Sequence, residues 1–282
     1  MSRVHFTKMQ GIGNDYVYVD ATREPLPEAA ALAVRWSDRH FGIGGDGLIL
    51  IEKPTVEDAD FRMRMFNNDG SEGAMCGNGV RCVGKFVYDK GLTRRRRLVI
   101  ETGAGLKRLS LLTGVDGKVS AVTVDMGEPV LSDRRLIDTP DGSMREGTVE
   151  AAGRSYRGTF VSMGNPHFVI FVDRLEDVDL TGEGKALEHH PIFPDRCNIE
   201  FAELRGSSKI RVRVWERGTG ITMACGTGAC ATTVAAVLTG RLSGQALVEM
   251  DGGELSIAWA GTGNSVLMTG PATTVFEGEI EL

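Results

Sequence analysis

Two cysteines, each followed at once by a glycine, are the residues of this sequence best suited to chemistry. Cys76 begins the run Cys-Gly-Asn-Gly, Cys225 begins the run Cys-Gly-Thr-Gly, and a segment with helical character follows each. At the start of a helix, free backbone N–H groups and the positive end of the helix dipole favour anions. Such a position lowers the pKa of a thiol and can also hold a carboxylate. The sequence therefore predicts two reactive thiols beside two anion sites.

The two cysteines belong to two copies of one longer segment. At a constant offset of 149 residues, five residues recur in both copies: Arg62, Arg64, Cys76, Gly77 and Gly79 return as Arg211, Arg213, Cys225, Gly226 and Gly228. Residues 164–171 also resemble residues 13–19, at an offset of 151. The agreement of the two offsets indicates an internal duplication of about half the chain.

A duplicated thiol suits acid–base work on a single carbon. One such cysteine would suggest a nucleophile, but neither cysteine has a neighbouring base in the arrangement typical of activated nucleophiles. Two thiols on facing halves fit removal of a proton from one face of a carbon and its return to the other face. Two helix starts aimed at an adjacent carboxylate would stabilise the carbanion between these steps. This pattern predicts inversion of an α-carbon.

Two other interpretations of the five cysteines compete with this one. A metal site favours Cys-x-x-Cys pairs or histidine partners. Here five residues separate Cys76 from Cys82, four separate Cys225 from Cys230, and no histidine is near. Free cysteine also often fills a protein core, which is what we expect for Cys82, Cys197 and Cys230. An odd count in a chain of this length argues against a disulfide framework.

The elements that must position these residues are mostly strands. Residues 62–66 and 211–215 alternate polar and apolar side chains, which predicts a half-buried strand ten residues before each reactive cysteine. Further strands are expected at 4–9, 16–20, 48–51, 98–100, 106–112, 119–125 and within 246–280. Helices are expected at 27–40, from Cys76 towards Gly91, and at 229–238. The last is apolar or small on every side, so we expect its own sheet to bury it.

Composition sets the class of protein. Glycine makes up 37 of 282 residues, well above the usual ~7%, which favours tight turns and short strands over a helical bundle. The net charge of −6 gives no support for nucleic acid or an anionic membrane as partner. The N-terminus lacks the apolar run of a signal peptide, and no segment is long enough to span a bilayer. We expect a soluble cytoplasmic protein with reduced thiols.

Two further motifs favour structural explanations. Gly42, Gly44 and Gly47 satisfy the G-x-G-x-x-G spacing of dinucleotide loops, but this run precedes an apolar strand, whereas the fingerprint follows a strand and opens a helix. A turn shaped by glycine is the better account. The four arginines at residues 94–97 could touch phosphate, but a solvated hairpin tip or helix end is the expected role in an acidic protein.

Taken together, the motifs of the whole chain resemble those of the diaminopimelate epimerase family. The resemblance is carried by Gly11-Ile12-Gly13-Asn14-Asp15, Phe66-Asn67-Asn68-Asp69-Gly70-Ser71-Glu72, Cys76-Gly77-Asn78-Gly79, Gly164-Asn165-Pro166-His167, Asn198-Ile199-Glu200-Phe201, Glu216-Arg217-Gly218 and Ala224-Cys225-Gly226-Thr227-Gly228. Any one of these is weak alone, and together they are specific.

The resemblance implies roles for individual residues. Cys76 and Cys225 would be the acid–base pair, and Glu216 would take the α-ammonium group with His167 close by. The carboxylate of the reacting centre would be held at the two helix starts by Gly77, Asn78, Gly226 and Thr227. The rest of the substrate, including its distal amino acid head, would be recognised by Asn14, Asn67, Asn165, Asn198 and Arg217. Amides suit a zwitterion, and an arginine can grip a carboxylate with two hydrogen bonds.

The resemblance also implies an architecture. It is an α+β fold of two pseudo-symmetric halves, each a curled, mainly antiparallel sheet wrapped around a central helix. The expected domains are residues 1–125 with Cys76 and residues 126–272 with Cys225, with residues 273–282 returning as a strand to the first half. The implied enzyme is a homodimeric isomerase that interconverts LL- and meso-diaminopimelate, without pyridoxal phosphate or metal, for lysine and peptidoglycan precursor synthesis.

Some alternatives stay open at the level of sequence. Asn14, Asn165 and Asn198 also fit simple turn support, His167 fits a core edge, and Glu216-Arg217 fits a surface pair. Some family members carry a glutamine contact where this chain has Gly47, so that contact is not expected here. Rival functions are a related two-cysteine racemase of histidine or proline type, and a non-catalytic small-molecule binding protein.

Overall fold

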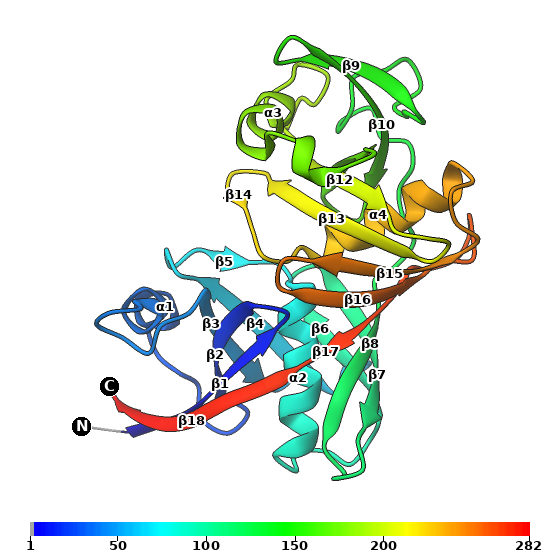
Figure 1. Ribbon diagram of the computed structural model, residues 1–282. Helices are drawn as coiled ribbons and strands as arrows, with labels where there is room; N and C mark the ends of the chain where they lie inside the picture. Colours follow the sequence, from blue (N-terminus) through cyan, green and yellow to red (C-terminus); the bar gives the residue numbers. More distant parts are fainter. Residues whose placement is uncertain (1–2) are drawn as a thin grey trace. The chain divides into compact units, whose positions relative to one another are not determined.

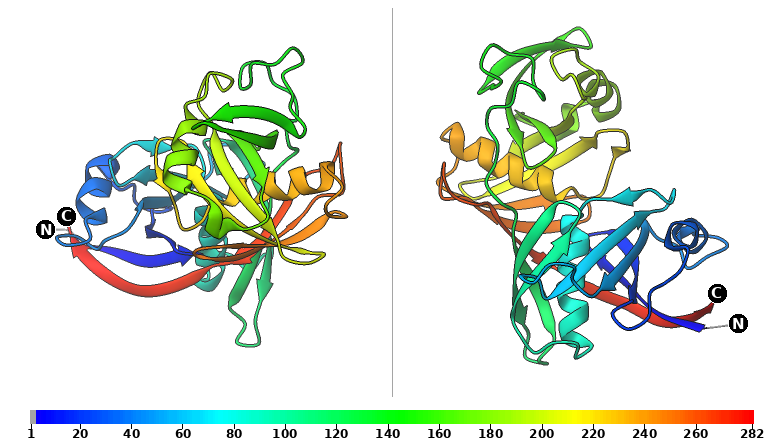
Figure 2. Two further views of the ribbon diagram at one scale, coloured as in Figure 1. Left: turned by 45° about the horizontal axis from the view of Figure 1, so that its top comes forward. Right: turned by 180° about the vertical axis from the view of Figure 1, so that it is seen from behind.

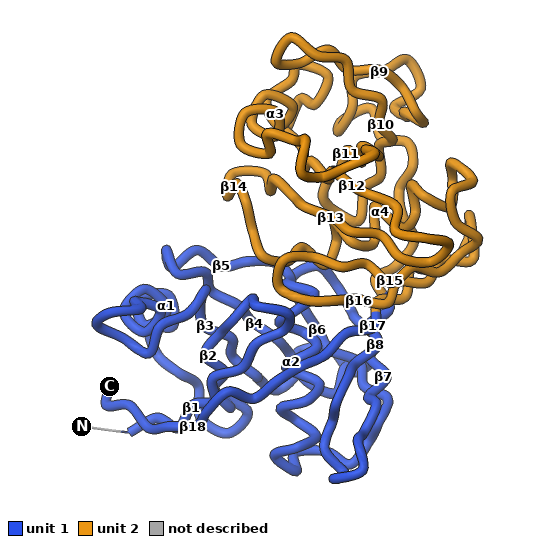
Figure 3. The backbone as a smooth tube through the Cα atoms, viewed as in Figure 1, with its two compact units in different colours: residues 1–125, 269–282 blue, residues 126–268 orange. Residues whose placement is uncertain are grey.

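The computed structural model describes residues 3–282 and divides the chain into two compact units. Unit 1 comprises Met1–Asp125 together with Thr269–Leu282, and unit 2 comprises Met126–Met268 (Figure 3). The chain returns to unit 1 inside a strand, four residues before the expected position at 273. Strands dominate both units, and the fold is the expected mixed α and β structure with few helices (Figure 1).

A curled mixed sheet forms unit 1. Its strands are β1 (Arg3–Gly11), β2 (Asn14–Asp20), β3 (Gly47–Glu52), β4 (Phe61–Asn67), β5 (Glu72–Gly73), β6 (Arg97–Thr102), β7 (Gly105–Thr113), β8 (Val119–Asp125) and β18 (Thr273–Glu281). The pairs β2–β3 and β4–β6 are parallel. The other pairs are antiparallel, including β1–β2, β3–β4, β6–β7 and β7–β8. At the edge, β18 runs antiparallel to β1, which places the two chain ends side by side (Figure 1).

Two helices serve unit 1 in different ways. Helix α1 (Ala29–Ser37) packs on one side of β3 and β4, and Trp36 is fully buried in that core. Helix α2 (Gly77–Asp89) packs inside the curl against β1, β2, β7 and β8, and is buried without interruption from its first residue to Val87. It ends before Gly91, which adopts the left-handed φ of 75° that a helix stop requires.

Unit 2 repeats this arrangement. Its strands are β9 (Gly147–Ala151), β10 (Arg154–Ser162), β11 (Pro166–Phe171), β12 (Asn198–Leu204), β13 (Lys209–Glu216), β14 (Gly220–Ile221), β15 (Gln245–Met250) and β16 (Gly253–Ala258). Strand β17 (Leu267–Pro271) spans the boundary, with its first two residues in unit 2 and the rest in unit 1. The pairs β11–β12 and β13–β15 are parallel. The pairs β9–β10, β10–β11, β12–β13 and β15–β16 are antiparallel. Its helices are η1 (Leu175–Asp177), α3 (Leu180–Glu188) and α4 (Gly226–Leu238).

The element order confirms the internal duplication. The series β1-β2-α1-β3-β4-β5-α2-β6-β7-β8 returns as β10-β11-α3-β12-β13-β14-α4-β15-β16-β17. The two parallel pairs fall at the same places in both series. Helices α2 and α4 have the same length of 13 residues and begin one residue after Cys76 and Cys225.

The apolar second helix is buried as predicted. Residues 228–236 of α4 are all buried, and the helix packs against β10, β11, β12, β15 and β16 of its own unit. It lies along those strands when unit 2 is viewed from behind (Figure 2). The helix begins at Gly226, three residues earlier than the sequence pattern placed it. A helix without a polar face is stable here because the sheet curls around it.

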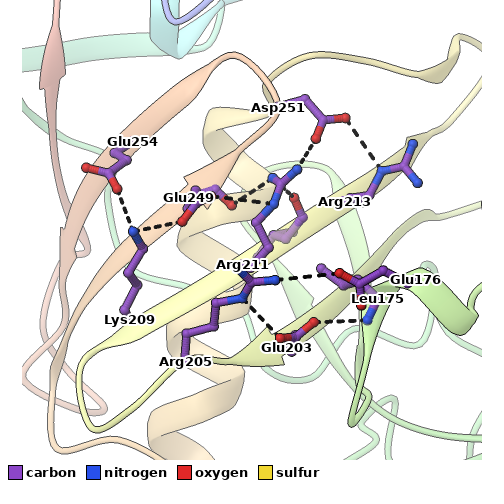
Figure 4. Close-up of polar contacts among 11 residues, drawn as sticks. Leu175, Glu176, Glu203, Arg205, Lys209, Arg211, Arg213, Glu249, Asp251 and Glu254 are labelled. Atoms are coloured by element: carbon purple, nitrogen blue, oxygen red, sulfur yellow. Dashed lines mark hydrogen bonds and ion pairs between the residues drawn. The ribbon is translucent and has the colours of Figure 1, made fainter.

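The arginines of the repeat are structural. In β13, Arg211 bonds the Asp251 carboxylate and the Glu249 backbone oxygen, and Arg213 pairs with Asp251 at 3.5 Å (Figure 4). In β4, the equivalent Arg64 bonds Glu72 at 2.8 Å. These ion pairs join each strand to the neighbouring strands and loops at the sheet surface.

Sequence patterns missed α3, which occupies the place of α1 in the repeat. Residues 94–97 form the exposed end of the connection after α2, as expected, and Arg95 pairs with Asp60 at 2.8 Å. The run from Gly42 to Gly47 leads into β3 and opens no helix. Within residues 3–282, no helix is long and apolar enough to cross a membrane.

Candidate active site

Each reactive cysteine is the N-cap of the central helix of its unit. Cys76 is extended, with φ −130° and ψ 122°, and its sulfur accepts a hydrogen bond from the Gly79 N–H at 3.3 Å. Cys225 has nearly the same conformation, with φ −125° and ψ 107°, and accepts from the Gly228 N–H at 3.4 Å. Because the first N–H groups of a helix have no partner within it, both thiols lie beside a site for an anion.

In unit 1 the thiol has an amide partner. The Cys76 thiol donates to Asn14 Oδ1 at 3.2 Å. Asn14 begins β2, and its Nδ2 donates to Asp46 Oδ2 at 2.7 Å. Cys76 and Asn14 are both half-buried. Of the amides predicted for unit 1, this one lies in direct contact with the reactive sulfur.

Two other predicted residues of unit 1 have mainly local partners. Asn67 ends β4, where its side chain donates to the Ser71 hydroxyl at 3.0 Å across a turn. Asn78 lies in the first turn of α2, and its buried Oδ1 accepts from Arg81 at 2.8 Å. Asn78 therefore offers an anion its backbone N–H, as does Gly77.

In unit 2 the thiol lies at the end of a chain of polar contacts. Cys225 Sγ is 3.5 Å from the Thr227 hydroxyl, which accepts from Asn165 Nδ2 at 3.3 Å. Asn165 Oδ1 is 3.2 Å from His167 Nε2. His167 Nδ1 lies 2.6 Å from Glu200 Oε1, and both side chains are fully buried. The structure thus brings four of the predicted residues and Glu200 into one connected network.

Burial governs the acid–base properties of this network. Burial raises the pKa of Cys225 well above the ordinary thiol value, and the carboxylates of Glu216 and Glu200 raise it further. Hydrogen bonds from Thr227 and Gly228 lower the pKa but do not outweigh these effects. The expectation of a lowered pKa was wrong for Cys225, because desolvation and two negative neighbours dominate the helix end.

Glu216 shares this environment. Burial raises the pKa of its carboxyl above the ordinary value of 4.5, while the Thr222 hydroxyl, donating at 2.5 Å, lowers it. His167, Glu200 and Cys225 also act on its titration, which places Glu216 beside the thiol. Glu216 ends β13 and is equivalent in the repeat to Asn67 at the end of β4.

Asn198 and Arg217 lie together at the edge of the network. Asn198 is buried, its Nδ2 donates to the Pro166 oxygen at 2.7 Å, and its Oδ1 accepts from the Arg217 backbone N–H at 2.9 Å. The Arg217 guanidinium bonds the Asp195 carboxylate at 2.6 Å. Asn198 therefore fixes the backbone that carries Arg217.

Sequence reasoning assigned no role to two carboxylates, Glu200 and Asp46. Glu200 follows Asn198 by two residues in β12, so their side chains share one face of the sheet. That face, in parallel register with β11, also carries His167. Such alternation is the signal that would have found Glu200. Asp46 lies between Gly45 and Gly47, in a run whose glycine spacing indicated only a turn.

The glycine at 47 is imposed by its surroundings. A Cβ at this position would lie 2.1 Å from the Phe66 backbone oxygen and 2.8 Å from the Tyr16 ring. The first residue of β3 therefore cannot carry a side chain without moving its neighbours, which accounts for the missing glutamine contact.

This geometry supports proton transfer. Each unit presents a thiol whose sulfur accepts from a helix N–H and contacts a second polar side chain. A carboxylate or carbanion at the helix ends would be stabilised by the same N–H groups. Among the described residues, no cluster of three histidine, cysteine or acidic side chains has the arrangement of a metal site.

Comparison with known proteins identifies close relatives. The family model described as diaminopimelate epimerase matches residues 6–132 and 159–275. The diaminopimelate epimerase of Phocaeicola vulgatus is 55% identical over 279 residues, covering 99% of both chains. That of Leptospira biflexa is 50% identical over 282 residues, covering 99% of this chain and 100% of the relative.

Solved structures with the same fold are more distant in sequence. A Bacillus anthracis protein of the PhzF phenazine biosynthesis family has a TM-score of 0.72 at 17% identity, covering 100% of both chains. A hydroxyproline epimerase from Agrobacterium vitis has a TM-score of 0.71 at 15% identity, covering 99% of this chain and 92% of that one. At these identities the likeness establishes the fold.

Proposed function

The chain belongs to the diaminopimelate epimerase family, and on this premise we propose that Cys76 and Cys225 epimerise diaminopimelate by two-base proton transfer. The enzyme is an isomerase that interconverts the LL- and meso-forms, a step in lysine biosynthesis. The observation that carries the two-base proposal is the placement of both thiols as N-caps of equivalent helices in a duplicated fold.

The proposed reaction needs no net change in protons. One cysteine, as thiolate, takes the α-proton from one face of the carbon, and the other cysteine gives its thiol proton to the opposite face. The reverse reaction exchanges their roles. The carbanion formed in between is stabilised through its carboxylate by the backbone N–H groups of Gly77-Asn78 and Gly226-Thr227, because these donors are fixed before the charge develops.

We propose that the unit 2 network recognises the amino group of the reacting centre. Glu216 would accept the α-ammonium group, with His167 beside it. Support comes from the contact network, in which Glu216 lies beside Cys225 and His167 is connected to Cys225 through Asn165 and Thr227. An arriving ammonium group would favour the charged form of Glu216 and thereby offset the effect of burial.

The remaining predicted contacts are proposed to recognise the distal amino acid head. These residues are Asn14, Asn67, Asn165, Asn198 and Arg217. Arg217 already pairs with Asp195, whose side chain is 73% exposed. A substrate carboxylate can share the guanidinium with Asp195, because a guanidinium has five N–H donors.

We further propose that the protein is a cytoplasmic homodimer. The two compact units would be the functional halves of each subunit. None of the five cysteines, all of which lie within residues 3–282, forms a disulfide, as suits a reducing compartment. Val275 and Phe276 of β18 are 55% and 45% exposed beside a hollow of about 420 Å³ in unit 1. Sedimentation should show a dimer that Phe276→Glu weakens and Val115→Glu, at another exposed apolar position, leaves intact. A monomeric parent chain would disprove the dimer.

Solvent exchange tests the chemistry directly. In D2O the purified protein should place deuterium on the α-carbon of diaminopimelate and interconvert its LL- and meso-forms. Cys76→Ala and Cys225→Ala should each abolish the interconversion. Cys230→Ala is the matched control, because this buried thiol lies in α4, the helix that Cys225 caps, and has no proposed chemical role. Undiminished turnover in either of the first two variants would refute the two-base scheme.

A further inference from the structure

A carboxylate with no part in the family motifs quoted above lies one side chain away from the Cys76 sulfur. Asp46 occupies the loop between α1 and β3, immediately before Gly47. Its Oδ2 accepts from Asn14 Nδ2 at 2.7 Å, and Asn14 Oδ1 accepts from the Cys76 thiol at 3.2 Å. We propose that Asp46 is a positioning residue, which holds the Asn14 amide with its oxygen towards Cys76 and so favours the protonated thiol.

The Asn14 amide lies between two partners, the Asp46 carboxylate and the Cys76 thiol. An ionised carboxylate only accepts hydrogen bonds, so it must face the NH2 end of a neighbouring amide. If Asp46 binds Nδ2, the carbonyl end of Asn14 must point the other way, towards Cys76. A carbonyl oxygen accepts from a thiol but repels a thiolate. The orientation of one amide therefore sets which form of Cys76 is favoured.

Asp46 is itself held in place. Its Oδ2 also accepts from the Asp15 backbone N–H at 3.0 Å, and its Oδ1 accepts from Arg39 at 3.2 Å. Its backbone N–H donates to the Asp15 oxygen at 2.7 Å. Three contacts besides the Asn14 amide thus fix the residue, so that it can impose an orientation on the amide.

The flanking glycine explains how the carboxylate comes so close. A Cβ at Gly45 would lie 2.8 Å from Lys8 Nζ and 3.1 Å from the Asp15 oxygen. At Gly47 a Cβ would lie still closer to a neighbour, the Phe66 backbone oxygen. Glycines on both sides of Asp46 are therefore required for the chain to pass close to β1, β2 and β4. This packing also explains the Gly-Asp-Gly sequence, which matches part of a dinucleotide motif.

Opposing hydrogen bonds meet at the Cys76 sulfur. The Gly79 N–H at 3.3 Å favours the thiolate, and the Asn14 oxygen at 3.2 Å favours the thiol. At Cys225 the second partner is instead the Thr227 hydroxyl, which can donate as well as accept, and the Glu216 carboxylate also lies beside the sulfur. On the proposed function, Asp46 thereby favours the form of Cys76 that gives a proton.

Other titratable groups near Cys76 do not change their protonation state over the pH range in which a thiol ordinarily ionises. Burial raises the pKa of Tyr18 well above 10 and that of Cys82 to about 11, so both stay neutral. The pKa of Asp15 is lowered despite burial by hydrogen bonds from Arg39 and Lys8, and that of Arg39 is raised by Asp15. The charged side chains around the loop and the first turn of α2 are Lys8, Asp15, Arg39, Asp46 and Arg81.

The experiment measures the thiol without substrate. In a Cys225→Ala background, the ultraviolet absorbance of thiolate is followed against pH for the parent and for Asp46→Asn. An asparagine at 46 can donate to Asn14, so the amide is free to turn its NH2 towards the sulfur and stabilise the thiolate. The midpoint of the Cys76 titration should fall by about one pH unit.

An Asn14→Ala background separates orientation from charge. There Asp46→Asn removes the same negative charge, but no amide remains to turn, so the midpoint should fall by much less, through the loss of charge alone. Equal shifts in both backgrounds, or no shift in either, would overturn the proposal. Folding is checked by circular dichroism, and Asp46→Ser replaces Asp46→Asn if that variant does not fold. Because no turnover is measured, this result is independent of the solvent-exchange test of the function.

Discussion

His167 and Glu200 form a hydrogen-bonded pair, with 2.6 Å between Nδ1 and Oε1, and neither side chain has any exposed surface. The other carboxylate oxygen of Glu200 has no hydrogen-bond partner among the described residues. A buried carboxylate with an unsatisfied oxygen is costly. The charge of Glu200 acts on the neighbouring thiol, because it opposes ionisation of Cys225.

Neutralising Glu200 should make Cys225 easier to ionise. Glu200→Gln removes one of the two carboxylates that raise the pKa of Cys225, so that pKa should fall, by about one unit. Thiolate absorbance against pH in a Cys76→Ala background measures the shift. Glu203→Gln is the matched control, because this residue lies on the same strand but pairs with Arg205. A Cys225 pKa that stays or rises in Glu200→Gln would contradict the prediction.

Thr227 should act in the opposite direction. Its hydroxyl lowers the pKa of Cys225 and accepts from Asn165, so Thr227→Val should raise that pKa further. We expect kcat to fall roughly 5- to 30-fold, since one or two hydrogen bonds of about 1 kcal/mol are lost. Thr227→Ser keeps the hydroxyl and should retain most activity. Equal loss in both variants would contradict the prediction, because it would show that the hydroxyl does not account for the role of Thr227.

Equivalent glycines in the two helices should differ in their tolerance of a methyl group. A Cβ at Gly228 would lie 2.7 Å from Glu200 Oε1 and 3.3 Å from the Cys225 sulfur. At Gly79 the closest atom is the terminal methyl group of the Ile49 side chain, at 2.8 Å. Gly228→Ala should cost about 1–3 kcal/mol of unfolding free energy. Gly79→Ala should be near neutral, because alanine gains up to ~1 kcal/mol of helix propensity. Urea unfolding compares them, and similar losses would refute the difference.

Stability should decline at alkaline pH because of buried thiols. Burial raises the pKa of Cys197 well above 9.0, the ordinary value that applies to the unfolded chain. Above pH ~9 the unfolded state therefore binds fewer protons than the folded state, and stability falls by up to about 1.4 kcal/mol per pH unit for each such thiol. Cys197→Ala should flatten this dependence in urea unfolding between about pH 8 and pH 10. An unchanged slope would contradict it.

The sequence was most informative where the repeat was strict. The offset of 149 residues between Cys76 and Cys225 predicted two equivalent helix starts, and both helices begin one residue later. The apolar or small residues on every side of the segment 229–238 predicted the buried helix α4. Helix α3 was missed because residues 180–188 mix glycine, acidic and apolar residues without a clear helical period.

Properties set by neighbours distant in sequence could not be foreseen. The pKa of Cys225 was expected to be low from its place at a helix start, but it is raised by burial and by carboxylates on β12 and β13. The contact between Asp46 and Asn14 joins residues 32 positions apart and depends on the parallel register of β2 and β3. Such contacts follow from strand pairing, which no local pattern specifies.

The pairing of β18 with β1 has a consequence for the order of events at the ribosome. Unit 2 is a single uninterrupted segment, Met126–Met268, so all of it has been synthesised before the final strand emerges. Unit 1 is built from segments on both sides of unit 2, so β1 meets its partner β18 only after all of unit 2 has been synthesised. A nascent chain therefore carries β1 with one edge unpaired until β18 emerges.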